Sequence, residues 1–220
     1  MTETRKQFHE ELAEINADVI RLGAMASEAI EAATSSMLDA DLGAVEHVVA
    51  HDHELDDLTH SIEDRTYLLL ARQQPMAVDL RTLVTVLRVI HELERVGDLM
   101  VNVAKATRRL YPHALDPKIR GHIDRMREQA GVQVRLAVET FAARDPARAS
   151  ALSDMDDVMD DLQKDLFRAI FASPNDDEAA IQRAVQIALV GRYFERVADH
   201  AVNVAERVAY MVTGEFRHAD

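Results

Sequence analysis

An internal duplication constrains the fold of this chain more than any other feature of its sequence. Residues 94–102 read ERVGDLMVN and residues 195–203 read ERVADHAVN, at an offset of 101. Earlier in each half the offset is 104, and apolar positions between residues 15 and 37 map onto apolar positions between residues 119 and 141. The second half has therefore lost three residues near the turn between its second and third helices. A sequence that repeats in this way is expected to build two copies of one structural unit.

Within each copy the apolar residues recur with a helical period. In the first segment they step by three or four residues along one face, as they do in the long helices of bundles. This stripe consists of Phe8, Leu12, Ile15, Val19, Leu22, Ala26, Ala29, Ala33 and Met37. Gly (7 residues) and Pro (5 residues) are scarce in the 220-residue chain, so few positions interrupt the helices.

The breaks between helices coincide with proline or with a capping aspartate. Asp116–Pro117 and Asp145–Pro146 each combine an N-cap acid with proline at the first helical position, and Asp41 is the expected cap where no proline occurs. Because the connections are short, consecutive helices should pack antiparallel. The predicted fold is all-α, with six helices in two tandem antiparallel three-helix bundles, residues 1–111 and 115–220. The six helices are expected at about 4–40, 42–73, 77–110, 117–143, 146–172 and 176–212.

Composition and charge narrow the classes of function. The chain contains no Cys, which excludes disulfides and thiolate metal sites and favours a cytoplasmic location. The charged stretch MTETRKQFHEELAEI lacks the apolar core of a signal peptide, and no apolar run is long enough to span a membrane. The formal net charge of −14 repels phosphate backbones and anionic lipid heads. We therefore expect cations and basic protein surfaces as partners, and neither nucleic acid nor bare membrane.

Four pairs of acids each place two carboxylates four residues apart, on one face of a helix. The pairs are Asp52 with Asp56, Glu94 with Asp98, Asp156 with Asp160, and Glu195 with Asp199. The first two pairs belong to the first half, and the last two occupy the duplicated positions of the second half.

The spacing around Pro75 is expected to bring the pairs of the first half together. Asp56 and Glu94 lie 19 residues on either side of Pro75, and Asp52 and Asp98 lie 23 residues on either side. A hairpin that turns at this proline sets all four carboxylates at one height across one interface. The second half repeats the arrangement if its turn lies three to four residues past its own proline.

Like charges at this spacing repel, so a compensating cation is expected. Oxygen ligands from neighbouring helices suit a divalent or trivalent ion such as Mg, Mn, Ca, Fe or Zn, and we expect metal at both sets of carboxylates. Two other interpretations stay open. The acids can form a merely solvated face, or an ordinary ion-pair network with Arg88, Arg95, Arg192 and Arg196.

Other polar residues near the acids have separate expected roles. A residue one position further along a helix points about 100° away, so His200 is not expected to share the ligand face of Asp199. Asn102 and Asn203 can add an amide oxygen to the sites or bond between helices, and we favour the second role. The histidines beside Asp52 and Asp56 are expected at the surface, and they are His51, His53 and His60.

Several segments resemble the PhoU family of phosphate-signalling regulators. LERVGDLMVNVA and FERVADHAVNVA resemble the paired signature of that family, and ARQQPMAVDLRTL resembles its turn between helices. HDHELDDL and DMDDVMDDL resemble its second-helix acid pairs, and YMVTGEFRH resembles its C-terminus. The resemblance covers nearly the whole chain. One departure is Gly97 in the first copy, where the second copy has Ala198, and it affects how closely the helices can approach.

The resemblance implies two three-helix bundles whose carboxylate-rich faces bind metal clusters. It also implies a cytoplasmic adaptor, and not an enzyme, that restrains a sensor histidine kinase of the phosphate-starvation response and adjusts the high-affinity phosphate ABC transporter. The implied partners are that kinase and the ATP-binding subunit of the transporter. Membrane contact would then occur only through these proteins, and a homodimer is the expected assembly.

Two other classes of function stay open. A ferritin-like di-iron oxidase is also a carboxylate-rich bundle, but it needs Glu-x-x-His on two inward-facing helices. Only Asp57–His60 and Glu215–His218 place an acid three residues before a histidine, so that pattern is not met. A passive helical scaffold is the other class. For an adaptor, partners can dock on the carboxylates themselves or elsewhere, for example on the side of the first and fourth helices.

Overall fold

The structure, a computed structural model, describes residues 2–173 and 177–215, and six α-helices account for most of them. No strand occurs in these two ranges, so the prediction of an all-α, six-helix fold is confirmed. The observed helix ends lie within two residues of the predicted ones. The helices are α1 (Thr2–Leu38), α2 (Leu42–Gln73), α3 (Val78–Leu110), α4 (Pro117–Ala143), α5 (Pro146–Ala172) and α6 (Glu178–Thr213).

Aspartate side chains begin four of the helices, because their carboxylates accept hydrogen bonds from backbone N–H groups of the first turn. Asp116 Oδ1 accepts from the Lys118 N–H at 2.8 Å, and Asp177 Oδ1 accepts from the Ala180 N–H at 2.6 Å. Asp41 and Asp145 cap α2 and α5 in the same way. The predicted caps at Asp41, Asp116 and Asp145 are therefore confirmed.

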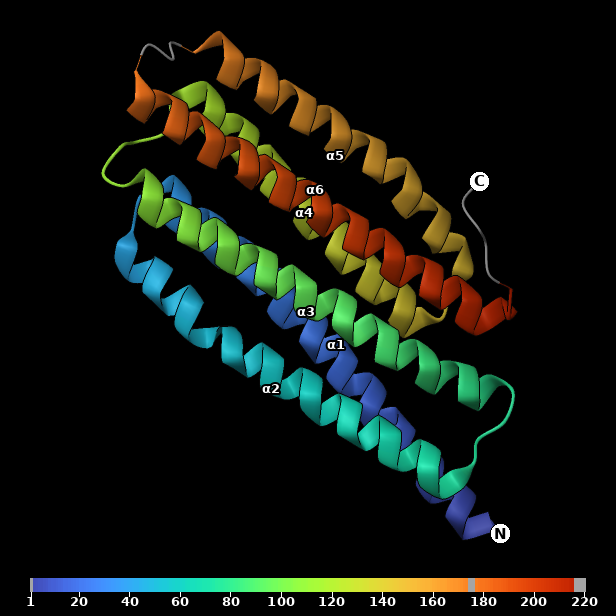
Figure 1. Ribbon diagram of the computed structural model, residues 1–220. Coiled ribbons are helices and arrows are strands. Elements are labelled where there is room, and N and C mark those ends of the chain that lie inside the picture. The colour runs from blue at the N-terminus through green and yellow to red at the C-terminus, as the bar shows by residue number, and fades with distance from the viewer. Residues whose placement is uncertain (1, 174–176, 216–220) are drawn as a thin grey trace.

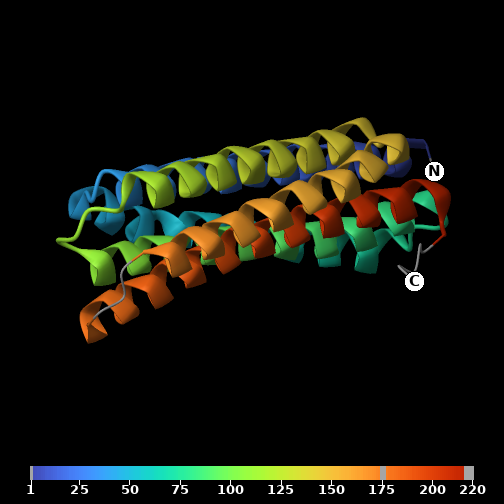
Figure 2. The ribbon, with the colours of Figure 1, turned by 90° about the horizontal axis from the view of Figure 1, so that it is seen from above.

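The helices are arranged as two groups of three. Helices α1, α2 and α3 pack on one another, as do α4, α5 and α6, and the groups join where α3 meets α6 and α1 meets α4. Figure 1 shows the helices running along one long direction, with α2 and α5 at opposite edges. Figure 2 shows α1 beside α4 in one layer and α3 beside α6 in the other. The α2–α3 and α5–α6 hairpins thus carry the acids on separate halves of the molecule.

The duplicated apolar positions form the core of both halves. None of the side chains at these positions is more than 5% exposed. The pairs are Ile15 and Ile119, Val19 and Ile123, Leu22 and Met126, Ala26 and Ala130, Ile30 and Val134, Ala33 and Ala137, and Met37 and Phe141. Ala29, which the predicted stripe includes, is only partly buried, and the neighbouring Ile30 occupies the core instead. Helices α1 and α4 therefore bury equivalent faces.

A glycine sets the distance between the halves along the α1–α4 seam. A β-carbon added at Gly23 would lie 2.3 Å from Val138 Cγ2 of α4, which is closer than real β-carbons approach. An ion pair between Arg127 Nη1 and Glu31 Oε2, at 2.5 Å, spans the same seam. No helix in the described part of the chain is long and apolar enough to cross a membrane.

Candidate functional site

The first carboxylate face, which we define as Asp52, Asp56, Glu94 and Asp98, lies between α2 and α3. The chain turns between these helices at residues 74–77, as the position of Pro75 predicts. Electrostatic repulsion links Asp52 to the other three carboxylates, and it links Asp56 to Glu94 and Asp98. The structure therefore brings together the four acids that the hairpin spacing predicts will meet.

Burial and repulsion make two acids of the first face resist ionisation. Burial raises the pKa of Asp52, the charges of Asp56 and Asp98 raise it further, and Lys105 opposes the shift. The pKa of Asp56 is raised by burial and then by the charges of Glu94 and Asp98. Carboxylates in this condition are stabilised in their charged form by an added cation.

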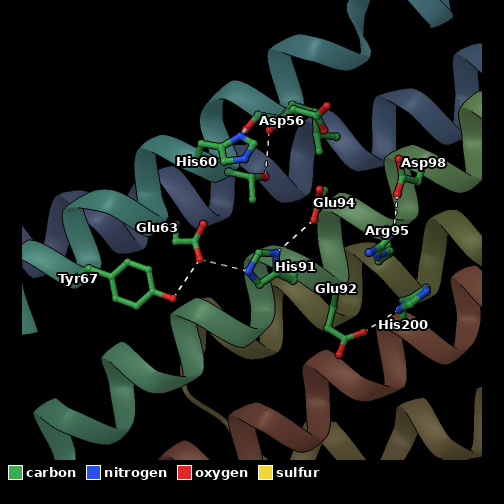
Figure 3. Close-up of polar contacts among 12 residues, drawn as sticks. Asp56, His60, Glu63, Tyr67, His91, Glu92, Glu94, Arg95, Asp98 and His200 are labelled. Atoms are coloured by element: carbon green, nitrogen blue, oxygen red, sulfur yellow. Dashed lines mark hydrogen bonds and ion pairs between the residues drawn. The ribbon is translucent and has the colours of Figure 1, made fainter.

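Two exposed basic side chains contact acids of the first face (Figure 3). Arg95 Nη1 donates a hydrogen bond to Asp98 Oδ2 at 2.9 Å. His91 lies between two carboxylates, with Nδ1 3.2 Å from Glu94 Oε2 and Nε2 3.6 Å from Glu63 Oε1. Because the Arg95 and His91 side chains are 61% and 51% exposed, a cation or a basic partner residue can displace them without opening the core.

The second carboxylate face, which we define as Asp156, Asp160, Glu195 and Asp199, lies between α5 and α6. The pKa of Asp156 is raised by burial and then by the charges of Asp199 and Asp160. The pKa of Glu195 is raised by burial and then by Asp199, while Arg192 opposes the shift. The duplicated acids therefore meet in the second half as they do in the first.

Two oxygen atoms of the second face are buried without a hydrogen-bond partner. They are Asp156 Oδ1 and Glu195 Oε2, and neither is paired within the described residues. The other oxygen of Glu195 accepts a hydrogen bond from Arg192, and the Glu195 side chain is only 12% exposed. An unpaired buried polar group costs about 1–3 kcal/mol, and more when it is charged. A bound cation would remove that cost.

The donor atoms of both faces fit a hard cation in chemistry, because they are carboxylate oxygens drawn from two helices. Within residues 2–173 and 177–215, no three or more His, Asp or Glu side chains are already arranged to hold a metal ion. The orphan oxygens of Asp156 and Glu195 favour the second face as the place for a cation. The acids that would hold a cation thus lie together, but they are not arranged as a complete coordination site.

The structure contains only part of the arginine–carboxylate ion-pair network that is the alternative to a metal site. Of the four arginines in that network, Arg95 binds Asp98 and Arg192 binds Glu195. Arg88 and Arg196 form no ion pair with a carboxylate in the described part of the chain. Each face therefore has one arginine in direct contact with its acids, while the charges of Lys105 and Arg196 act on Asp52 and Asp199 without an ion pair among the described residues.

The difference between Gly97 and Ala198 is compensated by the residues opposite. A β-carbon at Gly97 would lie 3.0 Å from Leu55 Cδ1 and 3.6 Å from Asp52 Oδ1, so α3 approaches α2 closely at the first face. The counterpart of Leu55 in the second half is Met159, a flexible side chain that can adapt to the larger Ala198. Both residues are fully buried.

His200 contacts Glu92 of α3 across the seam between the halves (Figure 3). Its Nδ1 lies 2.7 Å from Glu92 Oε2 of α3, and Asn203 Nδ2 donates to the same oxygen at 3.2 Å. These bonds confirm the expected inter-helix role of Asn203. No sequence argument identified Glu92. The sequence signal that could have identified it is its place two residues before Glu94, which sets it on the opposite side of α3.

The histidines beside the first face lie at the surface, as expected. His51 and His60 each bond through Nδ1 to a backbone carbonyl of α2, at 2.8 Å, and His53 is exposed. The His60 bond is made with the Asp56 carbonyl, so Asp57 and His60 do not form the inward pair of a di-iron site. The second acid–histidine pair, Glu215–His218, lies partly outside the described residues.

Comparison with protein families gives a match that covers both halves. The sequence profile described as "PhoU domain" matches residues 19–107 and again residues 123–208. Each matched segment contains one of the two carboxylate faces. The duplication in the sequence thus corresponds to two copies of one known domain.

Individual relatives match along nearly their whole length. The chain is 35% identical over 213 residues to the phosphate-specific transport system accessory protein PhoU homolog 2 of Mycobacterium tuberculosis, covering 96% of this chain and 99% of that protein. It is 30% identical over 207 residues to the PhoU homolog of Rhizobium meliloti, covering 94% and 87%. The crystal structure of PhoU from Pseudomonas aeruginosa superposes with a TM-score of 0.88 at 28% identity, covering 94% of this chain and 100% of that chain.

Proposed function

Because the chain belongs to the PhoU family, we propose that it is an accessory regulator of a phosphate transport system. The observation that carries this proposal is the end-to-end match to relatives named as phosphate-specific transport system accessory proteins. The chain would act as an adaptor and not as an enzyme. Its partners would be a sensor histidine kinase of the phosphate response and the ATP-binding subunit of the phosphate transporter.

The proposed function uses the two carboxylate faces as cation sites. Asp52, Asp56, Glu94 and Asp98 would hold one cation or cluster, and the four acids of the second face would hold the other. A divalent or trivalent ion such as Mg, Mn, Fe or Zn suits these oxygen donors. The raised pKa values and the orphan oxygens of the second face support this assignment. A bound cation would hold each hairpin together by offsetting the repulsion between its helices.

We propose that the carboxylate faces are also the surfaces on which partners dock. Each face is acidic and lies between two helices, and the basic side chains that contact it, His91 and Arg95 on the first face and Arg192 on the second, are exposed. Basic residues of a partner would meet complementary charge there, which favours rapid and specific association. The competing possibility is that the cation only braces each hairpin and that partners dock on the α1–α4 side.

The deciding experiment is a binding titration of the purified kinase and of the ATP-binding subunit against neutralised variants. Glu94→Gln/Asp98→Asn and Glu195→Gln/Asp199→Asn remove charge from one face each without changing side-chain size. Docking on the faces predicts at least tenfold weaker binding for one or both variants, provided that circular dichroism shows them folded. Unchanged affinity of both variants for both partners would leave the faces with a bracing role only.

Two further outcomes separate the proposed class from its rivals. A di-iron oxidase would consume oxygen when loaded with ferrous iron, whereas an adaptor would not, and an oxygen electrode measures the difference. A passive scaffold would keep its signalling after all eight acids are neutralised. We also expect a homodimer, which light scattering at micromolar concentration would detect.

A further inference from the structure

A groove of about 220 Å³ lies in the first half, beside the first carboxylate face, and all three helices of this half line it. Helices α1 and α2 form its walls, and Gly97 of α3 contributes to its floor. Small residues of α1, Ala29 and Ala32, leave space along one wall. Asp52 is the only residue that lines both this groove and the first face. The volume exceeds that of engineered cavities that hold one benzene molecule, about 150 Å³.

The second half has larger side chains at the equivalent positions. Ala29 and Ala32 correspond to Gln133 and Leu136, and Gly97 corresponds to Ala198. Gln133 is fully buried, so its side chain occupies interior space that Ala29 leaves open in the first half. The counterpart of Met25 is Gln129, whose Nε2 donates to the Met155 carbonyl at 3.0 Å and ties α4 to α5. The small residues that open the groove in the first copy are therefore replaced by larger ones in the second.

The groove also differs from its counterpart in charge. Two glutamates at its rim, Glu28 and Glu54, correspond to Val132 and Val158 in the second half. Within the groove, the Asp52 carboxylate accepts no hydrogen bond and forms no ion pair with a described residue. His47 and His51 complete the rim, and the His51 imidazole bonds to the His47 carbonyl. The first copy thus combines small groove-lining residues with two rim glutamates, whereas the second copy has larger side chains and valines at the equivalent positions.

The remaining walls are apolar. Val48 and Leu55 of α2 and Val101 of α3 line the groove between the rim and the floor. Burying an aliphatic chain against such walls contributes about 0.8 kcal/mol per methylene group. A carboxylate that is half-buried gains most from a cation that brings its own hydrogen-bond donors. The groove therefore suits a ligand that has both an aliphatic chain and a cationic head group with hydrogen-bond donors.

We propose that this groove binds a small organic cation with an aliphatic body, as a free molecule. Its ammonium or guanidinium head lies at Asp52, and its alkyl chain lies along Val48, Leu55 and Val101. The ligand differs in class from the metal ions of the carboxylate faces. Occupancy of the groove would place a positive charge next to the first face and thereby weaken cation binding there.

The test is a calorimetric titration of the full chain, in chelator, with n-pentylammonium, 1-pentanol and pentanoate. These probes share the aliphatic chain and differ in head-group charge. We expect pentylammonium to bind at least tenfold more tightly than pentanol, and pentanoate to show no binding. Equal affinity for pentylammonium and pentanol would overturn the proposal, since the acids would then play no part.

Variants that carry second-half residues at the groove positions test whether the ligand binds in the groove. Ala29→Gln/Ala32→Leu installs the side chains that the fold already accommodates at the equivalent positions, and we expect it to weaken pentylammonium binding at least tenfold. Glu28→Gln/Glu54→Gln should weaken it about threefold, because rim charges are screened. The control Glu128→Gln/Asp154→Asn changes net charge equally on exposed parts of α4 and α5 and should have no effect. Unchanged binding to Ala29→Gln/Ala32→Leu would place the ligand elsewhere and overturn the assignment.

Two further experiments distinguish ligand binding in the groove from metal binding at the first face and from the docking of a protein partner. Glu94→Gln/Asp98→Asn should lose metal at the first face but bind pentylammonium within threefold of the unmodified protein, so the two proposals fail independently. If the Ala29→Gln/Ala32→Leu variant were misfolded, a single Met25→Gln substitution and the shifts of the His47 and His51 imidazole signals on titration would serve instead. A blocked lysine derivative that binds tenfold more tightly than pentylammonium would overturn the free-ligand assignment, because a partner's side chain would then be the occupant.

Discussion

Glu92 of α3 and His200 of α6 share a hydrogen bond of 2.7 Å across the seam between the two halves of the molecule. Their side chains are 18% and 14% exposed, so water competes weakly for this contact. Asn203 donates to the same carboxylate oxygen, and these bonds hold the Glu92 pKa below its ordinary value against the opposing effect of burial. The seam therefore contains a polar connection as well as apolar packing.

Replacing Glu92 with alanine should destabilise the protein, because it leaves the part-buried side chains of His200 and Asn203 without their hydrogen-bond partner. We expect a loss of about 2 kcal/mol in the free energy of unfolding, measured by urea denaturation in chelator. Glu206→Ala, on an exposed position of α6, is the control and should change the value by less than about 0.5 kcal/mol. A double-mutant cycle with His200→Ala that gives no coupling energy would show that the pair contributes nothing to stability.

The metal-free protein should lose stability relative to a variant neutralised at the second face as pH rises above the ordinary carboxyl range. Burial raises the folded pKa values of Asp156 and Glu195 above 3.8 and 4.5, so the folded state holds these protons more tightly than the unfolded state. Their contribution to stability therefore falls as pH rises from about 4 through the folded pKa values. Asp156→Asn/Glu195→Gln should exceed the unmodified protein in stability at pH 7, and the difference should shrink on acidification toward pH 4.

That comparison is made by denaturant unfolding in chelator at a series of pH values. Glu92 acts in the opposite direction, because its pKa is lowered in the folded state. Its contribution to stability is present above pH 4.5, the ordinary pKa of glutamate, and is lost as pH falls through the folded pKa. Taking the difference between the variant and the unmodified protein removes this common contribution. A difference that stays constant from pH 4 to pH 7 would contradict the prediction.

Cation binding should stabilise the two halves independently. We expect added Mn or Mg to raise the melting temperature of the unmodified protein, because an ion that binds only the folded state shifts the unfolding equilibrium. Glu94→Gln/Asp98→Asn should lose metal at the first face and keep it at the second, as measured by elemental analysis of dialysed protein. Retention of the full metal content by this variant would show that the ligands were assigned wrongly.

A methyl group at Gly23 should push α1 and α4 apart. The added β-carbon would lie 2.3 Å from a γ-carbon of Val138, and a β-branched side chain has little freedom to move away. Gly23→Ala is expected to cost about 1–3 kcal/mol of unfolding free energy by chemical denaturation. Val138→Ala should restore part of this loss when the two are combined.

Gly121→Ala is the matched control for that substitution. Nothing lies within 4 Å of a β-carbon at this exposed position of α4, so the change only improves helix propensity. It should stabilise the protein by up to about 1 kcal/mol. Equal effects at the two glycines would mean that the α1–α4 seam is not closely packed in solution.

The helices and their number were predictable because local chemistry decides them. Asp41, Asp116 and Asp145 mark helix starts through hydrogen bonds within one turn, and a three-and-four spacing of apolar residues depends only on helix geometry. The meeting of Asp56 with Glu94 was predictable for a related reason. A hairpin of two straight helices has one free parameter, the position of its turn, and Pro75 supplies it.

By itself, then, the sequence determined the all-α fold, its duplication and the acids that gather on each hairpin. Only the tertiary structure decided that α3 packs on α6 and α1 on α4, that Glu92 accepts from His200, and that Asp156 and Glu195 each keep an oxygen without a partner. The physical reason is the distance along the chain between the residues that interact. Periodicity, capping and hairpin register follow from neighbours along the chain, whereas the contacts across the seam and the open groove depend on side-chain shapes from segments about 100 residues apart, packed at close distance.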